Sequence, residues 1–258
     1  MSVLEGLTAA LSDGSVQVID LTTPLSSDTP ILNLPQPLAN TVGLSLKPVS
    51  NFDDAGPAWA WNDVTVGEHA GTHLDAPVHW ITGRDGKSVD QIEPRRLVGR
   101  IAVIDKSAEA AQDPDFLLEP EHFDEWQLQH GQLPENCWVI FRTGWSARGG
   151  NPAAFVNADE NGPHTPGVSV AAAKWIAGND RISGFGVETV GIDAGQAATM
   201  DPMFPVHSFL LGADKYGITS LRNIERLPAT GATLLVSPLP IVGGTGSPAR
   251  VFAFVEGS

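Results

Sequence analysis

Residues 68–80 read EHAGTHLDAPVHW and hold three of the seven histidines of the chain, His69, His73 and His79, with Asp75 among them. Imidazole and carboxylate groups are good ligands for divalent transition metals. Four such groups lie within eleven residues of a chain that is otherwise poor in histidine. This density favours a metal site over a chance gathering of surface histidines.

The backbone of this segment is predicted to be extended or irregular, although His69 and His73 have the spacing of a helical zinc site. Gly71 lies between the two histidines, Pro77 follows closely, and the glutamate of the helical motif is absent. Glycine and proline both disfavour a helix interior. We therefore expect a bend at Gly71 that brings His69 back toward the other side chains.

In an extended segment, His73 and Asp75 point to the same side because they are two residues apart. We expect these two residues and His69 to be the metal ligands. Three protein ligands leave positions open for water and substrate, which is typical of a catalytic site. His79 is left over from this set and is a candidate general base.

The composition indicates a globular protein and argues against polyanionic partners. The chain has 258 residues, of which 42% are hydrophobic, and its formal net charge is −15. Such a surface repels phosphate backbones and anionic membranes, so neither nucleic acid nor a membrane is an expected partner. No change of composition separates two parts, so we expect one domain over residues 1–258.

The start of the chain, MSVLEGLTAALSDG, has neither a basic region nor a long apolar core, so it does not resemble a signal peptide. No window approaches the roughly 20 apolar residues of a membrane span. Cys137 is the only cysteine and lies in the apolar run CWVIF. We expect a buried structural thiol and a cytoplasmic protein.

The order of predicted elements mixes strands and helices without regular alternation. We expect helices over residues 3–11, 120–130 and 169–177, where Phe123, Trp126 and Leu128 form the apolar side of the second helix. Strands are expected over residues 16–21, 41–48, 100–105, 137–141, 187–193, 216–221, 232–238 and 249–255. The predicted fold class is α/β, with a closed or curved mixed sheet and helices packed outside.

The GGTGSP run and the histidines outside the cluster also bear on function. The run GGTGSP, residues 243–248, lacks the lysine of a phosphate-binding loop and precedes a strand, so we interpret it as a tight structural loop. Of the histidines outside the cluster, His207 is the one expected to reach the site. No nucleophile elbow is present, so a serine or cysteine nucleophile is not supported.

The segment HAGTHLDAPVHW resembles the HxGTHxDxPxH signature of the cyclase-like metal-dependent hydrolases, which include kynurenine formamidases and isatin hydrolases. VIDLTTPL, VIFRTGW, VGIDAG, PVHSFLLG and GGTGSPARVFA resemble further segments of that family. The resemblance implies a swivelling β/β/α fold, a homodimer whose partner contributes to the active site, and hydrolysis of an amide C–N bond by metal-activated water. It also implies His69, His73 and Asp75 as ligands, His79 as the catalytic histidine and His207 beside the metal.

One departure from the family pattern bears on the substrate. Thr219 and Ser220 stand where formamidase-like members have Glu and Asn, and that Glu helps to hold a second zinc. The resemblance therefore favours one metal ion per subunit, Mn²⁺ with Zn²⁺ as the alternative, and the opening of isatin to isatinate. His207 and Ser220 are expected to position water or the product carboxylate.

Three tryptophans flank the signature, namely Trp59, Trp61 and Trp80. Flat aromatic walls suit a flat aromatic amide, and plain core packing is the competing interpretation. The alternative activities are those of a kynurenine formamidase or of a hydrolase for another cyclic amide. From a different class, the alternative is a metal-binding or ligand-binding protein without turnover.

Overall fold

A computed structural model describes residues 2–34 and 36–257. Its centre is an eight-stranded sheet in the order β1–β14–β13–β5–β7–β11–β12–β4. The sheet closes on itself because β14 (Gly246–Glu256) also pairs with β4 (His73–Asp75). The predicted closed mixed sheet with helices outside is therefore confirmed, and β4 lies at the point of closure.

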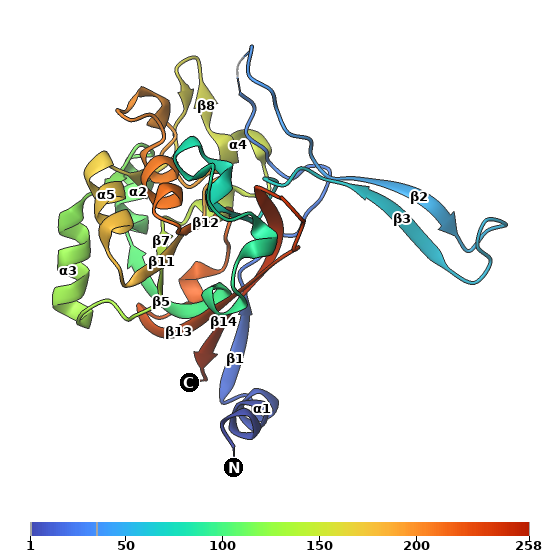
Figure 1. Cartoon of the computed structure of the whole chain (residues 1–258), viewed down its shortest axis with the longest axis horizontal. Helices are drawn as coiled ribbons and strands as arrows, with labels where there is room; N and C mark the ends of the chain where they lie inside the picture. The colour runs from blue at the N-terminus through green and yellow to red at the C-terminus, as the bar shows by residue number, and fades with distance from the viewer. Residues whose placement is uncertain (1, 35, 258) are drawn as a thin grey trace.

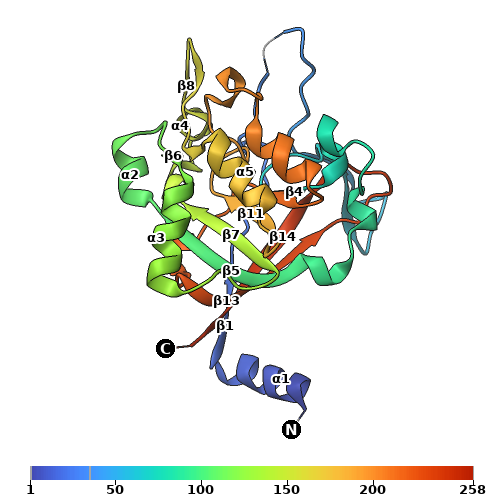
Figure 2. The ribbon, with the colours of Figure 1, turned by 60° about the vertical axis from the view of Figure 1, so that its left-hand side comes forward.

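The four strands β5, β7, β11 and β12 run parallel to one another, whereas the pairings of β13, β14, β1 and β4 are antiparallel. The helices α3 and α5 lie against the side of the sheet formed by β5, β7 and β11 (Figures 1 and 2). The bounds of the strands and helices are β1 Val16–Asp20, β2 Ser45–Asn51, β3 Ala60–Thr65, β5 Val98–Asp105, β6 Leu117–Leu118, β7 Cys137–Arg142, β8 Ala158–Asp159, β9 Gly162–Pro163, β10 Gly167–Val168, β11 Ile182–Val187, β12 Tyr216–Ile218 and β13 Thr230–Pro238, with α1 Val3–Asp13, α2 Ser107–Gln112, α3 Pro120–His130, α4 Pro152–Val156 and α5 Val170–Gly178.

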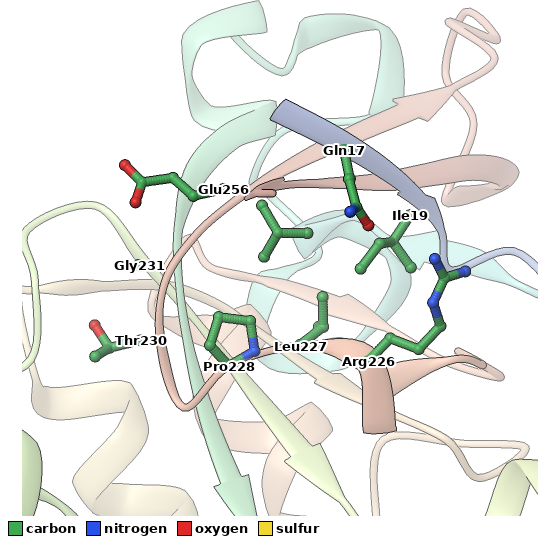
Figure 3. Close-up of a pocket in the computed structure, with 9 residues that line it drawn as sticks. Gln17, Ile19, Arg226, Leu227, Pro228, Thr230, Gly231 and Glu256 are labelled. Carbon is green, nitrogen blue, oxygen red and sulfur yellow. The ribbon is translucent and has the colours of Figure 1, made fainter. Parts of the chain in front are cut away.

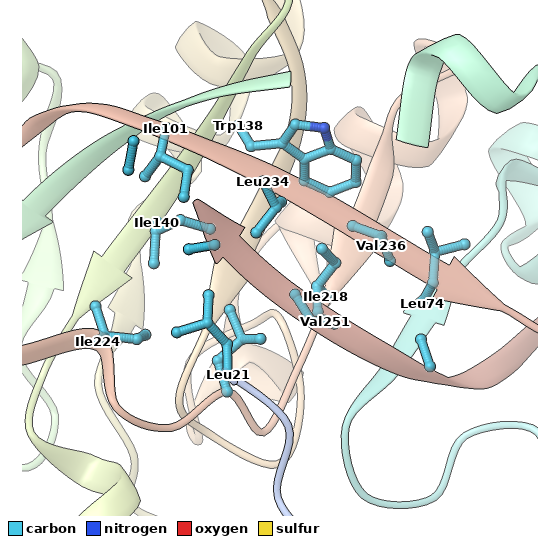
Figure 4. Packing of buried hydrophobic residues seen from close by; sticks show 14 of the residues in the cluster. Leu21, Leu74, Ile101, Trp138, Ile140, Ile218, Ile224, Leu234, Val236 and Val251 are labelled. Carbon is cyan, nitrogen blue, oxygen red and sulfur yellow. The ribbon is translucent and has the colours of Figure 1, made fainter. Parts of the chain in front are cut away.

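Two hydrophobic cores occupy the two faces of the sheet. Strand β7 shows the division, because Trp138 and Ile140 belong to the core enclosed by the sheet while Val139 and Phe141 face the helices. Figure 4 shows the enclosed core, with Trp138 above the side chains of the surrounding strands. Every apolar residue of β7 is buried, as its continuous apolar run predicts.

Two segments extend away from this body (Figures 1 and 2). The hairpin of β2 and β3 projects on one side, and almost all of its residues are exposed. Helix α1 projects from the body at the N-terminal end of β1 and contains no buried residue. Within the described residues, no helix combines the length and the apolar character needed to cross a membrane.

Three expectations differ from the structure. Only Val187 of the strand expected over residues 187–193 lies in a strand, as the last residue of β11. The chain then leaves the sheet, and the Glu188 carboxylate accepts the backbone N–H groups of Thr143 and Gly144, both at 2.6 Å. The strand expected over residues 41–48 is displaced to β2. Leu128 is 88% exposed, since a residue two positions from Trp126 lies on another side of the helix.

Candidate metal centre

The extended backbone predicted for the histidine segment is present. His73 and Asp75 lie on the short strand β4, which is held on both sides by β12 and β14. Gly71 has a φ of 62°, and a Cβ atom there would lie 2.5 Å from the side chain of Leu25. The bend therefore requires glycine at this position, and it returns His69 to the side chain of Asp75.

The carboxylate of Asp75 lies at the centre of the cluster and is 1% exposed. Its Oδ1 atom lies 2.8 Å from Nδ1 of His69 and 3.3 Å from Nε2 of His73. Burial alone would raise the pKa of Asp75, but the neighbouring histidines outweigh it and hold that pKa well below its usual value. The group is therefore an anion inside the protein.

The other oxygen, Oδ2, is buried and has no hydrogen-bond partner among residues 2–34 and 36–257. A buried carboxylate oxygen without a partner is costly unless a cation satisfies it. Ligand atoms bound to one transition metal at about 2.1 Å lie roughly 3 to 3.5 Å apart, close to the spacings around Asp75. The residues present therefore fit a divalent metal ion.

His73 has its metal-facing nitrogen fixed by its surroundings. Its Nδ1 atom lies 2.8 Å from the carbonyl oxygen of Gly71, which only accepts hydrogen bonds. Nδ1 therefore carries the proton, and the free lone pair is on Nε2, which faces Asp75. Thr219, the residue at the position of the family's glutamate, places its hydroxyl 3.0 Å from the same Nδ1 and brings no negative charge.

His79 lies directly beside this group. Its ring stacks on that of His69, with centroids 3.8 Å apart, and it follows β4 in a short 3₁₀ turn, Pro77–His79. Side-chain ligand atoms of His69, Asp75 and His79 all lie within 4.8 Å of one another. Burial lowers the pKa of His79 to about 3, so its ring is neutral at pH 7.

His207 reaches the cluster from a distant part of the chain, at the start of the π-helical turn His207–Leu211. Its Nε2 atom lies 4.0 Å from Oδ2 of Asp75, and its Nδ1 atom lies 2.5 Å from Oδ2 of Asp193. Burial opposes the charged form, yet Asp193 and Asp75 prevail and raise the pKa of His207 above its usual value.

The aromatic residues divide between the site and the hairpin. Trp80 packs against His207 at a centroid distance of 4.7 Å and donates from Nε1 to the hydroxyl of Ser208 at 3.1 Å. Trp59 and Trp61 are 47% and 59% exposed and lie by the projecting hairpin. The hairpin projects away from the body (Figure 1), so the segment that carries the two tryptophans lies apart from the site of its own subunit, and their contact with substrate stays a prediction.

The hydroxyl of Ser220, expected to act at the site, donates to the carbonyl oxygen of Thr189 at 3.5 Å. Its backbone has a φ of 53°, and its catalytic role stays a prediction.

Sequence reasoning missed three residues that contact the histidines or their neighbours, namely Glu68, Asp193 and Thr245. Glu68 adjoins His69 in the sequence, and the available signal for the other two was that VGIDAG and GGTGSPARVFA, which contain them, resemble segments of the family.

A separate cavity of about 550 Å³ opens at another part of the sheet. Figure 3 shows its apolar floor of Ile19, Leu227 and Pro228, with Arg226 and Glu256 at its margin. None of the clustered histidines lines it. The ligand chemistry around Asp75, rather than the size of this hollow, identifies the candidate site.

Comparison with known proteins gives consistent results. Residues 19–194 match the model of the family described as putative cyclase. The isatin hydrolase of Roseibium aggregatum is 46% identical over 257 residues, covering 98% of this chain and 97% of that protein. The kynurenine formamidase of Salinibacter ruber is 30% identical over 185 residues, covering 70% and 74% of the two chains.

Solved structures extend the likeness to the whole fold. A crystal structure of an isatin hydrolase bound to the product analogue thioisatinate has a TM-score of 0.96, with 44% identity and 100% of both chains covered. Isatin hydrolase A from Ralstonia solanacearum also has a TM-score of 0.96, with 45% identity and 99% and 98% of the chains covered.

Proposed function

The chain belongs to the cyclase family, and from this membership we propose that it is a metal-dependent amidohydrolase that opens the lactam ring of isatin to give isatinate. The full-length similarity to isatin hydrolases in sequence and fold supports this activity. The site agrees with this activity, because Thr219 places a hydroxyl and no carboxylate beside His73. Asp75 is therefore the one acidic residue among the proposed ligands. One metal ion per subunit follows from that ligand set.

His69, His73 and Asp75 would hold the metal ion, which we propose to be Mn²⁺, with Zn²⁺ as the alternative. When bound, the metal supplies Lewis acidity, which polarises a carbonyl group and acidifies water. Two atoms of the chain have lone pairs available for this metal ion, namely Oδ2 of Asp75 and Nε2 of His73.

His79 is the proposed general base. Its ring is neutral at pH 7, because burial keeps its pKa low, so it can accept a proton from the attacking water. The water oxygen forms a bond to the lactam carbonyl carbon, and the C–N bond then breaks. The same proton is returned to the departing nitrogen, and the new carboxyl group releases its remaining proton to solvent. The product carries an aromatic amine and a carboxylate.

His207 is proposed to hold the carbonyl or product oxygen. Its Nδ1–H group is directed at Asp193, so in the charged form its Nε2–H group is a donor facing the cluster. The raised pKa of His207 favours this charged form. Trp80, packed against its ring, would form one wall for a flat aromatic substrate.

We further propose that the protein is a homodimer whose hairpin of β2 and β3 docks on the partner subunit. Large apolar side chains are exposed along this arm, including Leu46, Val49, Phe52, Trp59 and Trp61. Exposed apolar area of this kind marks an interaction surface. A partner that receives the arm would acquire Trp59 and Trp61 near its own site. The expected cytoplasmic location stays a prediction.

The test is a comparison of two substrates with the same metal-loaded protein. Isatin is expected to be opened at an appreciable rate, and N-formylkynurenine is expected to be a poor substrate. The reverse preference would assign the chain to the kynurenine formamidases. Binding of metal without turnover of either compound would favour a binding protein.

A further inference from the structure

The segment GGTGSP, residues 243–248, consists of the turn before β14 and the first three residues of that strand, and it lies against the metal centre. The hydroxyl oxygen of Thr245 is 2.9 Å from Nε2 of His69. The same hydroxyl is 2.6 Å from Oε2 of Glu68, which also accepts the backbone N–H of Thr245 at 3.2 Å. A continuous contact therefore runs from a carboxylate, through a hydroxyl, to a histidine of the site.

The direction of each hydrogen bond follows from the number of protons available. An ionised carboxylate only accepts, so the single hydroxyl proton of Thr245 is donated to Glu68. The hydroxyl oxygen then accepts from His69, which requires the ring proton to be on Nε2. Nδ1 is therefore the nitrogen whose lone pair is left for a metal ion, and it lies 2.8 Å from Oδ1 of Asp75, close to the spacing of two ligand atoms on one ion.

The backbone at Gly246 packs closely against the same histidine. A Cβ atom at Gly246 would lie 2.6 Å from Cε1 of His69 and 2.6 Å from the carbonyl oxygen of Leu74. Gly246 is also paired with Asp75 in the sheet, and the carbonyl of Thr245 accepts the backbone N–H of Ala76 at 3.0 Å. The loop is therefore joined to β4, which carries two of the proposed ligands.

We propose that Thr245 is a positioning residue that links Glu68 to His69, fixes the Nε2-protonated tautomer of His69 and so presents Nδ1 to the metal ion. Partners of this kind orient metal-bound histidines and raise their basicity. This assignment rests on the proposed role of His69 as a ligand, and it gives the GGTGSP loop a function beyond a tight turn.

The test is a metal titration in the absence of substrate, which separates this proposal from the assignment of isatin. Thr245→Val keeps the shape of the side chain and removes the hydroxyl. We expect its dissociation constant for Mn²⁺ to rise roughly 10- to 100-fold. Thr245→Ser restores the hydroxyl and is expected to bind Mn²⁺ within about threefold of the unmodified protein.

Ser247→Ala is the matched control within the same loop. The hydroxyl of Ser247 accepts from the backbone N–H of Leu239 at 2.9 Å and donates to the carbonyl of Pro248, without a contact to His69. Its affinity for Mn²⁺ is expected to match that of the unmodified protein. Equal weakening in Ser247→Ala and Thr245→Val would show a general effect of loop stability and would overturn the proposal.

The tautomer itself can be read from the ¹⁵N chemical shifts of the His69 ring in the protein loaded with diamagnetic Zn²⁺, because without a cation the anionic Asp75 would draw the ring proton to Nδ1. The unmodified protein is expected to show the proton on Nε2, hydrogen-bonded to Thr245, and the metal ion on Nδ1. In Glu68→Ala the Thr245 hydroxyl has lost its acceptor and can donate to Nε2, so the Nε2–H tautomer is expected to lose population. An unchanged tautomer in Glu68→Ala, or unweakened Mn²⁺ binding in Thr245→Val, would contradict the proposed link.

Discussion

The carboxylate of Asp193 holds the ring of His207 by a short hydrogen bond, with 2.5 Å between Oδ2 and Nδ1. The backbone N–H of Val206 bonds to Oδ1 of the same carboxylate at 2.7 Å, so the acid is itself fixed by the chain that carries the histidine. Because an ionised carboxylate only accepts, Nδ1 of His207 is the donor and Nε2 is directed at Asp75.

Asp193→Asn is therefore expected to lower kcat for isatin by roughly 100-fold while KM changes little. Asparagine has the same shape but no negative charge, so it no longer favours the charged form of His207 in which the Nε2–H group faces the cluster. Steady-state kinetics measure both constants. Asp124→Asn, an exposed change on α3, is the control. A rise in KM alone would show that Asp193 acts on substrate binding instead.

The exposed tryptophans of the hairpin give a prediction about assembly. The double variant Trp59→Ala, Trp61→Ala is expected to weaken a dimer by about 30-fold or more in its dissociation constant, because buried tryptophans dominate interface energies. Light scattering after size-exclusion chromatography measures the mass as a function of concentration. KM for isatin is expected to rise in the same variant if the arm reaches the partner's site.

Leu128→Ala, which removes a still more exposed apolar side chain from α3, is expected to leave mass and KM unchanged. A double variant of Trp59 and Trp61 with unaltered mass and unaltered KM would contradict the docking of the arm.

Cys137 is expected to be unreactive in the folded protein. It is fully buried on β7, and burial raises the pKa of its thiol to about 12, so the reactive thiolate is scarce at pH 8. Labelling with a thiol reagent is expected to follow the rate of unfolding in urea. Complete labelling of the native protein within seconds would contradict this placement.

Lys215 links stability to pH. Burial lowers the pKa of its amine to about 8, although Nζ donates to the carbonyl oxygens of Ile176 and Asn179 near the end of α5. The unfolded chain retains the proton up to its ordinary pKa of 10.5, so between these two values it binds more protons than the folded chain. The contribution of Lys215 to the free energy of unfolding therefore increases as the pH rises from about 8 to 10.5.

Urea unfolding of the unmodified protein and of Lys215→Met at pH 7.5 and pH 9.5 measures this contribution. The unmodified protein is expected to gain stability relative to the variant at the higher pH. Equal differences at the two pH values would show that the amine has the same pKa in both states.

Local spacing in the sequence predicts the parts of the site that lie on one short segment. Gly71 and Pro77 exclude a helix, and the spacing of His73 and Asp75 places both on one side of a strand. The family resemblance predicts that His207 lies beside the metal, whereas its apolar surroundings alone are typical of an ordinary core histidine. These features depend on few residues, each with a strong conformational preference.

Contacts made across the fold leave no such signal. His69 and Thr245 are 176 residues apart, and their contact depends on the pairing of β14 with β4. Asp193 was expected at the end of a strand, but it lies in a loop because the chain leaves the sheet after Val187. The exposure of Trp59 and Trp61 likewise follows from the projection of the hairpin, which no local pattern shows.

The rate of isatinate formation before and after metal removal decides whether the protein opens isatin with a bound metal ion. Turnover of isatin is expected to vanish after dialysis against a chelator and to return fully with one equivalent of Mn²⁺ per subunit. Asp75→Asn is expected to lose both the bound metal and the turnover, because Asp75 is the acidic residue of the proposed ligand set. Turnover that persists in the metal-free protein would contradict a metal-dependent hydrolase. A second equivalent of metal needed for full rate would contradict one metal ion per subunit.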